Sequence, residues 1–203
     1  MESKPKHILI GASGHAKVVL DILEKSDKRI LCLLELKSKV DEVFKYPVFN
    51  EKEFSITNEH KVIISVGDNK RRQLIASKLN VSFGLAKHPE ASVSNYVKIG
   101  LGCMIMAKSV INPDVKIGEH CIINTACVIE HDCTIGDYAH VSPGAVVCGG
   151  VTIQEGVHIG AGAVILPGIK IGSWATIGAG AIVTKNVPDG SIVVGNPGRV
   201  INS

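Results

Sequence analysis

The chain has 203 residues, enough for one large domain or two small ones with a buried core. Its formal net charge is only +3 and no cluster of lysine or arginine stands out, so nucleic acid is not expected as a partner. The opening residues are too polar for a signal peptide, and no apolar run approaches the length that spans a membrane. We therefore expect a cytoplasmic protein that does not insert into membranes.

The first part of the chain alternates apolar strands with helical stretches. A short strand over residues 7–10 ends in the turn Gly-Ala-Ser-Gly-His at residues 11–15, and a helix follows. Apolar runs over residues 30–34 and 62–66 predict buried parallel strands, and residues 69–79 predict a second helix. The expected apolar faces are Val18, Val19, Ile22 and Leu23 in the first helix and Leu74, Ile75 and Leu79 in the second.

This alternation predicts a small α/β domain with a parallel sheet, half of a Rossmann-like fold. Right-handed crossovers bring the ends of its strands to one edge, where ligands bind in such sheets. The residues at these strand ends are Gly11, Glu35, Gly67 and Asp68.

The turn after the first strand is a candidate anion site. Its exposed N–H groups and the dipole of the following helix suit a diphosphate. The candidate binding residues are Gly11, Ser13, Gly14 and His15. A plain tight turn fits the same residues, because the full dinucleotide-binding fingerprint is missing.

A six-residue repeat dominates the rest of the chain. From Val93 to Val183 every sixth residue is isoleucine or valine, at sixteen consecutive positions. This period fits neither an α-helix nor an ordinary hairpin, and it is the signature of a hexapeptide-repeat parallel β-helix. Three hexads form one triangular coil, so the repeat predicts a little over five coils. A boundary at His88 and Pro89 gives domains at residues 1–87 and 88–203.

The repeat also accounts for most cysteines and for the corner glycines. The cysteines Cys103, Cys121, Cys127 and Cys133 occupy its small inward position, so we expect core packing rather than disulfides or zinc ligands. Glycines are expected at corners where a tight turn needs a positive φ. These glycines are Gly100, Gly118, Gly136, Gly160, Gly172 and Gly178. The tail after Val187 is expected to close the open end of the last coil.

One corner of the β-helix carries an unusual set of residues. His131 and Asp132 lie there, and one coil later the same positions are Gly149 and Gly150. A histidine beside a carboxylate, next to bare backbone, offers a base with room for a ligand, because imidazole titrates near neutral pH and the carboxylate can fix its tautomer. An ordinary solvated polar turn fits the same residues.

His140, nine residues after His131, is expected at the following corner, stacked over His158. A surface ladder of histidines is an equally good interpretation. The three histidines raise the alternative of a metal-dependent hydrolase of the carbonic-anhydrase type. Their spacings do not match such a site, so no metal is expected.

These motifs together resemble the hexapeptide-repeat O- and N-acyltransferases of sialic-acid and nucleotide-amino-sugar biosynthesis. The resemblance is strongest to the N-acetyltransferases that act on UDP-4-amino-4,6-dideoxy sugars, as in bacillosamine formation. It rests on the Gly-Ala-Ser-Gly-His turn and on Gly-Asp-Asn at 67–69, Ile-Glu-His-Asp at 129–132, Ala-His-Val-Ser at 139–142 and Val-Gly-Asn-Pro at 194–197. It implies a left-handed parallel β-helix and a homotrimer with active sites between neighbouring subunits.

The resemblance also implies roles for single residues. His131 would be the general base, Asp132 would raise its basicity, and His140 would contact the thioester region of acetyl-CoA. The backbone at three positions along one edge would line the pantetheine path; these are Gly149, Ala161 and Ala179. Relatives place two acidic residues after the second strand to bind the nucleoside. Here only Glu35 matches, which leaves the nucleotide base open.

The predicted function is an acetyl-CoA-dependent N-acetyltransferase acting on the amine of a nucleotide-linked amino sugar. The amine would attack the thioester directly, without a metal or a cysteine nucleophile. The oxyanion would be stabilised by His140 or by a backbone N–H. An O-acetyltransferase for sialic acid or another sugar hydroxyl would use the same fold and base. A non-catalytic hexapeptide-repeat protein that binds or scaffolds is the alternative from another class.

Overall fold

A mostly parallel sheet forms the centre of the N-terminal domain. The computed structural model describes residues 5–202. The elements of this domain are β1 (Lys6–Ile10), α1 (Gly14–Lys25), β2 (Arg29–Glu35), β3 (Glu42–Val43), β4 (Tyr46–Asn50), β5 (His60–Ile64) and α2 (Asn69–Ala76). The sheet order is β3-β4-β2-β1-β5, and only β3 is antiparallel to its neighbour. The chain places β2 and β4 on one side of β1 and β5 on the other, so a topological switch point lies beside β1, where ligands bind in open α/β sheets.

Both helices form where the sequence predicts them, with two differences in burial. Val18 of α1 is 40% exposed and Leu74 of α2 is 55% exposed, so the expected burial of these two side chains is wrong. In α1, neighbouring side chains point about 100° apart, and Val19 and Ile22 already face the core. α2 instead buries Asn69, Arg72 and Ala76, because its polar side faces the β-helix.

The β-helix has three sheets, in which the strands of the repeat pair in parallel with the strand one coil later, as Val128 pairs with Val146. The valine sheet contains β7 (Ser92–Val93), β10 (Val110–Ile111), β13 (Val128–Ile129), β16 (Val146–Val147), β19 (Val164–Ile165) and β22 (Ile182–Val183). The lysine sheet contains β8 (Lys98–Ile99), β11 (Lys116–Ile117), β14 (Thr134–Ile135), β17 (Thr152–Ile153) and β20 (Lys170–Ile171). The domain-facing sheet contains β6 (Ala86–Lys87), β9 (Met104–Ile105), β12 (Ile122–Ile123), β15 (His140–Val141), β18 (His158–Ile159), β21 (Thr176–Ile177), β23 (Ile192–Val194) and β24 (Arg199–Asn202).

The isoleucine and valine ladder forms the core of the β-helix, as predicted. From Ile105 to Val183 its members are at most 4% exposed, and only Val93 and Ile99 of the first coil are partly buried. The four cysteines of the repeat are buried free thiols within this core. The first strand of the domain-facing sheet, β6, precedes His88 and pairs with β9.

The corner glycines are required for a different reason from the one expected. The six predicted glycines are not the ones with positive φ. At Gly136, for example, a Cβ would lie 2.6 Å from the backbone nitrogen of Glu155 on the next coil, so glycine permits close stacking of coils. The left-handed positions come two residues later in each corner, and several are occupied by other residues, such as Asp132 and Tyr138.

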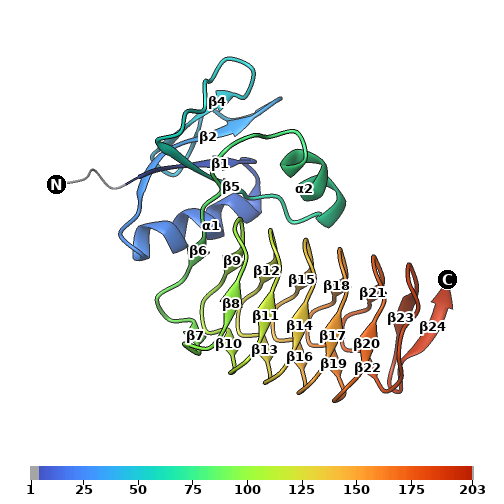
Figure 1. Cartoon of the computed structure of the whole chain (residues 1–203). Helices are drawn as coiled ribbons and strands as arrows, with labels where there is room; N and C mark the ends of the chain where they lie inside the picture. The colour runs from blue at the N-terminus through green and yellow to red at the C-terminus, as the bar shows by residue number, and fades with distance from the viewer. Residues whose placement is uncertain (1–4, 203) are drawn as a thin grey trace.

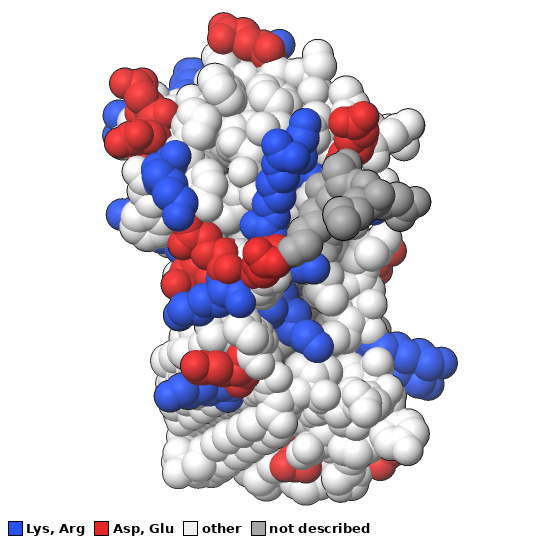
Figure 2. Space-filling view, turned by 90° about the vertical axis from the view of Figure 1, so that its left-hand side faces the viewer, with Lys and Arg blue, Asp and Glu red and all other residues white. Residues whose placement is uncertain are grey.

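The N-terminal domain lies on the domain-facing sheet, over the first coils of the β-helix (Figure 1). α1 fills the space between the two sheets, where Val19, Leu20 and Leu23 share one apolar cluster with Met104 and Ile122. The domains therefore share a core. On the face seen in Figure 2, lysine and arginine side chains are interspersed with aspartate and glutamate side chains.

The C-terminal tail closes the last coil, as predicted. Val187 forms a bridge with Ile171, β23 continues the domain-facing sheet, and β24 then pairs antiparallel to β23. Neither helix within residues 5–202 is long and apolar enough to cross a membrane.

Candidate active site

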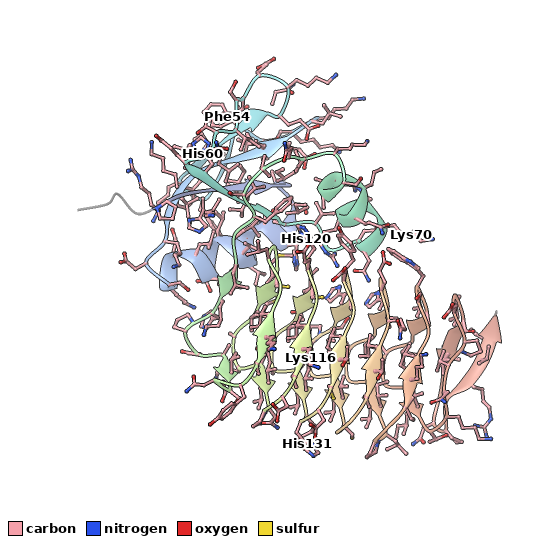
Figure 3. The ribbon with its side chains drawn as sticks, viewed as in Figure 1. Phe54, His60, Lys70, Lys116, His120 and His131 are labelled. Carbon is pink, nitrogen blue, oxygen red and sulfur yellow. The ribbon has the colours of Figure 1, made fainter. Side chains whose placement is uncertain are left out.

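Several candidate residues lie at the three edges of the β-helix. We name each edge by one of its residues. The His131 edge joins the valine sheet to the lysine sheet, the Trp174 edge joins the lysine sheet to the domain-facing sheet, and the Ala161 edge joins the domain-facing sheet to the valine sheet. In Figure 3 His131 lies at the edge opposite the N-terminal domain, whereas His120 lies beside that domain.

His131 and Asp132 form the predicted pair. Nδ1 of His131 lies 2.7 Å from Oδ2 of Asp132, and both side chains are 64% exposed. The hydrogen bond that His131 donates to Asp132 raises the pKa of His131 above its ordinary value, and the charges of Asp132 and Glu130 add to the rise. With the Nδ1 proton on the carboxylate side, Nε2 is the nitrogen left to accept a proton.

The imidazole of His131 lies over Gly149 on the next coil. A Cβ on Gly149 would lie 2.8 Å from Cε1 and 2.9 Å from Nε2 of His131. The room expected for a ligand beside the histidine is therefore occupied by the ring itself. Gly149 permits this position, because any side chain there would collide with the ring.

His140 lies in strand β15 and not at a corner, so its predicted place is wrong. It is the outward residue of a two-residue strand, because the inward position of the hexad belongs to Val141. The predicted stacking is confirmed: the His140 and His158 rings are parallel, with centroids 5.0 Å apart. The N-terminal domain covers His140, which is why it is not an open surface ladder.

The hydrogen bonds of His140 fix its tautomer. The backbone N–H of Thr125 donates to Oδ1 of Asn124 at 2.8 Å, so the amide nitrogen of Asn124 faces Nε2 of His140 at 3.0 Å. Nε2 is then an acceptor and the proton resides on Nδ1. Burial lowers the pKa of His140 to about 3, with smaller contributions from neighbouring positive groups, and the ring is neutral at physiological pH.

His15 approaches His140 from the N-terminal domain. It lies in the first turn of α1, with its ring centroid 6.5 Å from that of His140. Its Nε2 is buried without a hydrogen-bond partner, and burial followed by the charge of Arg72 lowers its pKa. Ser13, the N-cap residue of α1, makes no side-chain capping bond. The exposed Ser13 side chain and the free N–H groups of the helix start are open to an anion.

The ends of the strands form a crevice at the switch point. A hollow of about 210 Å³ is lined by Gly11, Glu35, Val66 and Arg71, among others. The N–H of Ala12 donates to Oε2 of Glu35 at 3.2 Å, so this carboxylate reaches the phosphate-binding turn from the end of β2. In Rossmann-like folds an acidic residue at this strand end binds ribose hydroxyls.

Gly67 and Asp68 lie on the other side of the start of α2. They line a second hollow of about 460 Å³ with Lys70, His140 and Trp174. Oδ1 of Asp68 accepts from the N–H of Arg71 at 2.7 Å and caps α2. The predicted substrate residues therefore divide between two hollows, one at the strand ends and one against the β-helix.

The three predicted pantetheine positions do not share one edge. Ala161 and Ala179 lie on the Ala161 edge, and Gly149 lies on the His131 edge. One full coil returns the chain to the same edge, whereas the step from Gly149 to Ala161 is two thirds of a coil and passes two sheets. The expectation of a single edge is wrong within one chain.

The cysteines of the core offer no nucleophile. Burial raises the pKa of Cys127 to about 12 and also raises the pKa of Cys133. Among residues 5–202, no group of three histidine, cysteine, aspartate or glutamate side chains is placed to hold a metal ion.

Sequence reasoning missed Asn124, Arg72 and Trp174. Asn124 lies on the coil before His140, one residue after the inward Ile123, so alignment of successive coils would have placed it beside that histidine. Arg72 was missed because the apolar residues of α2 indicated a different buried face of the helix. Trp174 carried no motif, and only its position one coil after Gly156 indicates that the indole lies against bare backbone.

Comparison with known proteins gives one consistent result. Residues 6–79 match the PglD N-terminal domain, and residues 150–185 match the bacterial transferase hexapeptide family (six repeats). A search of curated proteins finds no match.

Three solved structures are similar over almost the whole chain. The acetyltransferase domain of PglB from Neisseria gonorrhoeae FA1090 is 33% identical, with 97% of this chain and 100% of that chain covered and a TM-score of 0.90. PerB from Caulobacter crescentus, in complex with CoA and GDP-perosamine, is 32% identical, with 98% of each chain covered and a TM-score of 0.88. WeeI from Acinetobacter baumannii AYE is 28% identical, with 96% of this chain and 99% of that chain covered and a TM-score of 0.89.

Proposed function

The chain belongs to the family of acetyl-CoA-dependent sugar N-acetyltransferases that join a PglD-type N-terminal domain to hexapeptide repeats, and we propose that it acetylates the amine of a nucleotide-linked amino sugar. The observation that carries the proposal is the His131 and Asp132 pair, with its free Nε2 held over Gly149 at an edge of the β-helix. No other described histidine combines an exposed ring with a carboxylate partner.

The reaction needs one base and no covalent enzyme intermediate. The sugar amine attacks the thioester carbonyl carbon, and Nε2 of His131 takes the proton that the nitrogen loses. The carbon–sulfur bond then breaks, CoA leaves as a thiolate, and the imidazolium returns the proton to it. Asp132 stabilises the imidazolium between these steps.

A backbone N–H is the better donor to the oxyanion than His140. Nε2 of His140 accepts a hydrogen bond from Asn124, and a hydrogen bond to the Gly67 backbone engages the ring as well. His140 is therefore assigned to shaping the pocket as a neutral ring. Donation from backbone at the edge, where Gly149 presents no side chain, fits the geometry that such sites require.

The nucleotide end of the substrate belongs in the strand-end crevice. Its diphosphate would lie on the free N–H groups after Ala12, with Ser13 and His15 as donors and Glu35 on the ribose. The unpartnered Nε2 of His15 supports this placement, because buried polar atoms normally have a partner. From here the sugar extends toward His140.

We place the complete site between copies of the chain, in a homotrimer. His131 lies at the edge opposite the N-terminal domain, so one chain does not bring the base to its own nucleotide crevice (Figure 3). The valine sheet, which adjoins the His131 edge, presents an outward apolar row. The row consists of Val110, Val128, Val146, Val164 and Ile182. Burying this row against another copy would set the His131 edge of one chain beside the crevice of the next, with acetyl-CoA between Gly149 of one copy and Ala161 and Ala179 of the other.

The substrate assignment is tested by incubating the protein with acetyl-CoA and a panel of UDP- and GDP-linked amino sugars and following released thiol. Transfer to a 4-amino sugar supports the proposal. If only hydroxyl acceptors react, or if calorimetry detects no binding of acetyl-CoA, the proposal is wrong. The six free cysteines fit a reducing compartment, and we propose the cytoplasm as the site of action.

The shared site is tested by mixing two impaired variants and assaying them at a nucleotide-sugar concentration well below KM. His131→Asn removes the base, and Glu35→Ala weakens the nucleotide crevice of another copy. If the site lies between copies, co-expression produces some interfaces with both wild-type halves, and activity returns. Purified mixtures that stay inactive after exchange of subunits would place the whole site in one chain.

A further inference from the structure

Arg72 is a fully buried arginine at the contact between the two domains. Its side chain is 0% exposed, and it lies on the face of α2 that meets the β-helix. All of its nitrogens are hydrogen-bonded. Nε donates to the carbonyl of His120 at 2.8 Å, and Nη2 donates to the carbonyl of Tyr138 at 2.8 Å and to Oδ1 of Asn69 at 2.9 Å.

The same guanidinium also holds the turn that precedes α2. Nη1 donates to the carbonyls of Val66 at 3.0 Å and Gly67 at 3.2 Å. Val66 lines the strand-end crevice, and Gly67 lines the hollow that contains His140. One side chain therefore joins the walls of both hollows to the β-helix.

The contacts follow the stacking of successive coils. Arg72 binds the carbonyls of residues 120 and 138, and the amide nitrogen of Asn69 binds the carbonyl of Gly156 at 3.1 Å. These three carbonyls belong to successive coils at the Trp174 edge. Gln73, one residue after Arg72, donates to Oε1 of Glu155 at 2.6 Å. α2 is thus seated along the edge in a single register.

None of the acceptors of Arg72 is a carboxylate. Burial lowers the pKa of this guanidinium to about 10, and a cation without a paired anion is costly to bury. Its charge contributes to the lowered pKa of His15, His140 and His158, after burial in each case. An apolar side chain would be enough to fill this space. The buried charge and the branched set of guanidinium donors therefore indicate a role beyond packing.

We propose that Arg72 is a positioning residue, which locks the turn at Val66 and Gly67 against the β-helix so that a nucleotide sugar bound in the strand-end crevice is aligned with the histidines of the domain-facing sheet. This inference rests on the proposed function, because the aligned ligand is its substrate. Lysine at this position would keep the charge and lose the fork that spans five acceptors. Methionine would lose both.

Three variants test the role: Arg72→Lys, Arg72→Met and Asn69→Ala, with Lys78→Met, an exposed position beyond α2, as the control. We expect Arg72→Lys to raise KM for the nucleotide sugar about tenfold or more and to leave KM for acetyl-CoA within about twofold. Asn69→Ala should show the same split with a smaller rise. Lys78→Met should match the wild type.

Histidine titration by NMR supplies a readout that does not depend on turnover. Arg72→Lys should keep the histidines of the domain-facing sheet neutral over the same pH range as the wild type, whereas Arg72→Met should let them protonate at higher pH. If Arg72→Met does not fold, the lysine and alanine variants still decide the matter. A wild-type KM for the nucleotide sugar in Arg72→Lys would overturn the positioning role.

The two proposals fail in different ways. If the wild type transfers no acetyl group to any amino sugar, the proposed function fails. Calorimetry with UDP and GDP then measures whether Arg72→Lys weakens nucleotide binding in the crevice. Unchanged nucleotide binding in Arg72→Lys, together with only a lowered Tm, would show that Arg72 has a structural role alone.

Discussion

Replacing Gly149 by alanine displaces the imidazole of His131 while both residues of the His131 and Asp132 pair are retained. Gly149 does not need a positive φ, so alanine is compatible with its backbone. The new Cβ would lie 2.8 Å from Cε1 of His131, whereas ordinary contact begins at 3.4 Å. The exposed imidazole must therefore move by about 0.6 Å or rotate away.

A displacement of this size moves Nε2 out of line with the attacking amine. Misplacement of a catalytic group by about 1 Å can cost about 100-fold, so we expect kcat to fall about 10- to 100-fold. The free energy of unfolding should change by less than about 0.5 kcal/mol, because His131 is exposed and the ring can yield. Thiol release with saturating acetyl-CoA measures kcat, and urea titration measures stability.

A double-mutant cycle separates this effect from damage to the acetyl-CoA path. His131→Asn alone should lower kcat by about 100- to 10,000-fold. If Gly149→Ala acts through the base, adding it to His131→Asn should change kcat by less than about twofold, because the displaced group is already absent. Additive losses would show that Gly149 acts elsewhere, and an unaltered kcat in the single variant would refute the reasoning.

Three further changes test the other parts of the site. Asp132→Asn should move the acidic limb of the kcat/KM profile to lower pH and lower its plateau, because the hydrogen bond that raises the pKa of His131 loses its charge and the base must be neutral to act. Asp114→Asn, one coil earlier at the same corner position, is the control, and a matching shift there would contradict a specific role for Asp132. Val146→Lys should dissociate the assembly, as seen by light scattering, and lower activity more than about tenfold, whereas Thr152→Lys on the lysine sheet should do neither. Glu35→Gln should raise KM for the nucleotide sugar about tenfold at an unchanged KM for acetyl-CoA. If KM for the nucleotide sugar equals that of the wild type, the nucleotide does not bind in the strand-end crevice.

The β-helix was predictable because one six-residue repeat determines its geometry. Each hexad has two inward positions, one large and one small, and isoleucine or valine fills the large one without exception from Ile105 to Val183. The same period located the His131 and Asp132 pair opposite Gly149, since residues one coil apart must lie over one another. The strand-end crevice followed from parallel topology, which brings Gly11 and Glu35 to one edge.

Contacts between the domains were not predictable from these periods. Apolar spacing alone favoured burial of Leu74, but α2 meets backbone carbonyls of the Trp174 edge, which only polar donors such as Asn69 and Arg72 can satisfy. The predicted corner position of His140 is wrong, because this residue directly precedes the inward Val141 in strand β15. An outward strand residue can be polar too when another domain provides its partners.

The reversed direction of β24 has a consequence for how the protein behaves at high concentration. A stack of parallel coils ends in a row of unpaired backbone groups, which is a template for adding another stack end to end. By turning back along β23, the chain offers the next molecule an edge of opposite polarity to the rest of the sheet. Nothing in the six-residue repeat prevents another coil from pairing with the last one. The antiparallel strand β24 occupies that edge of the domain-facing sheet and so limits end-to-end association.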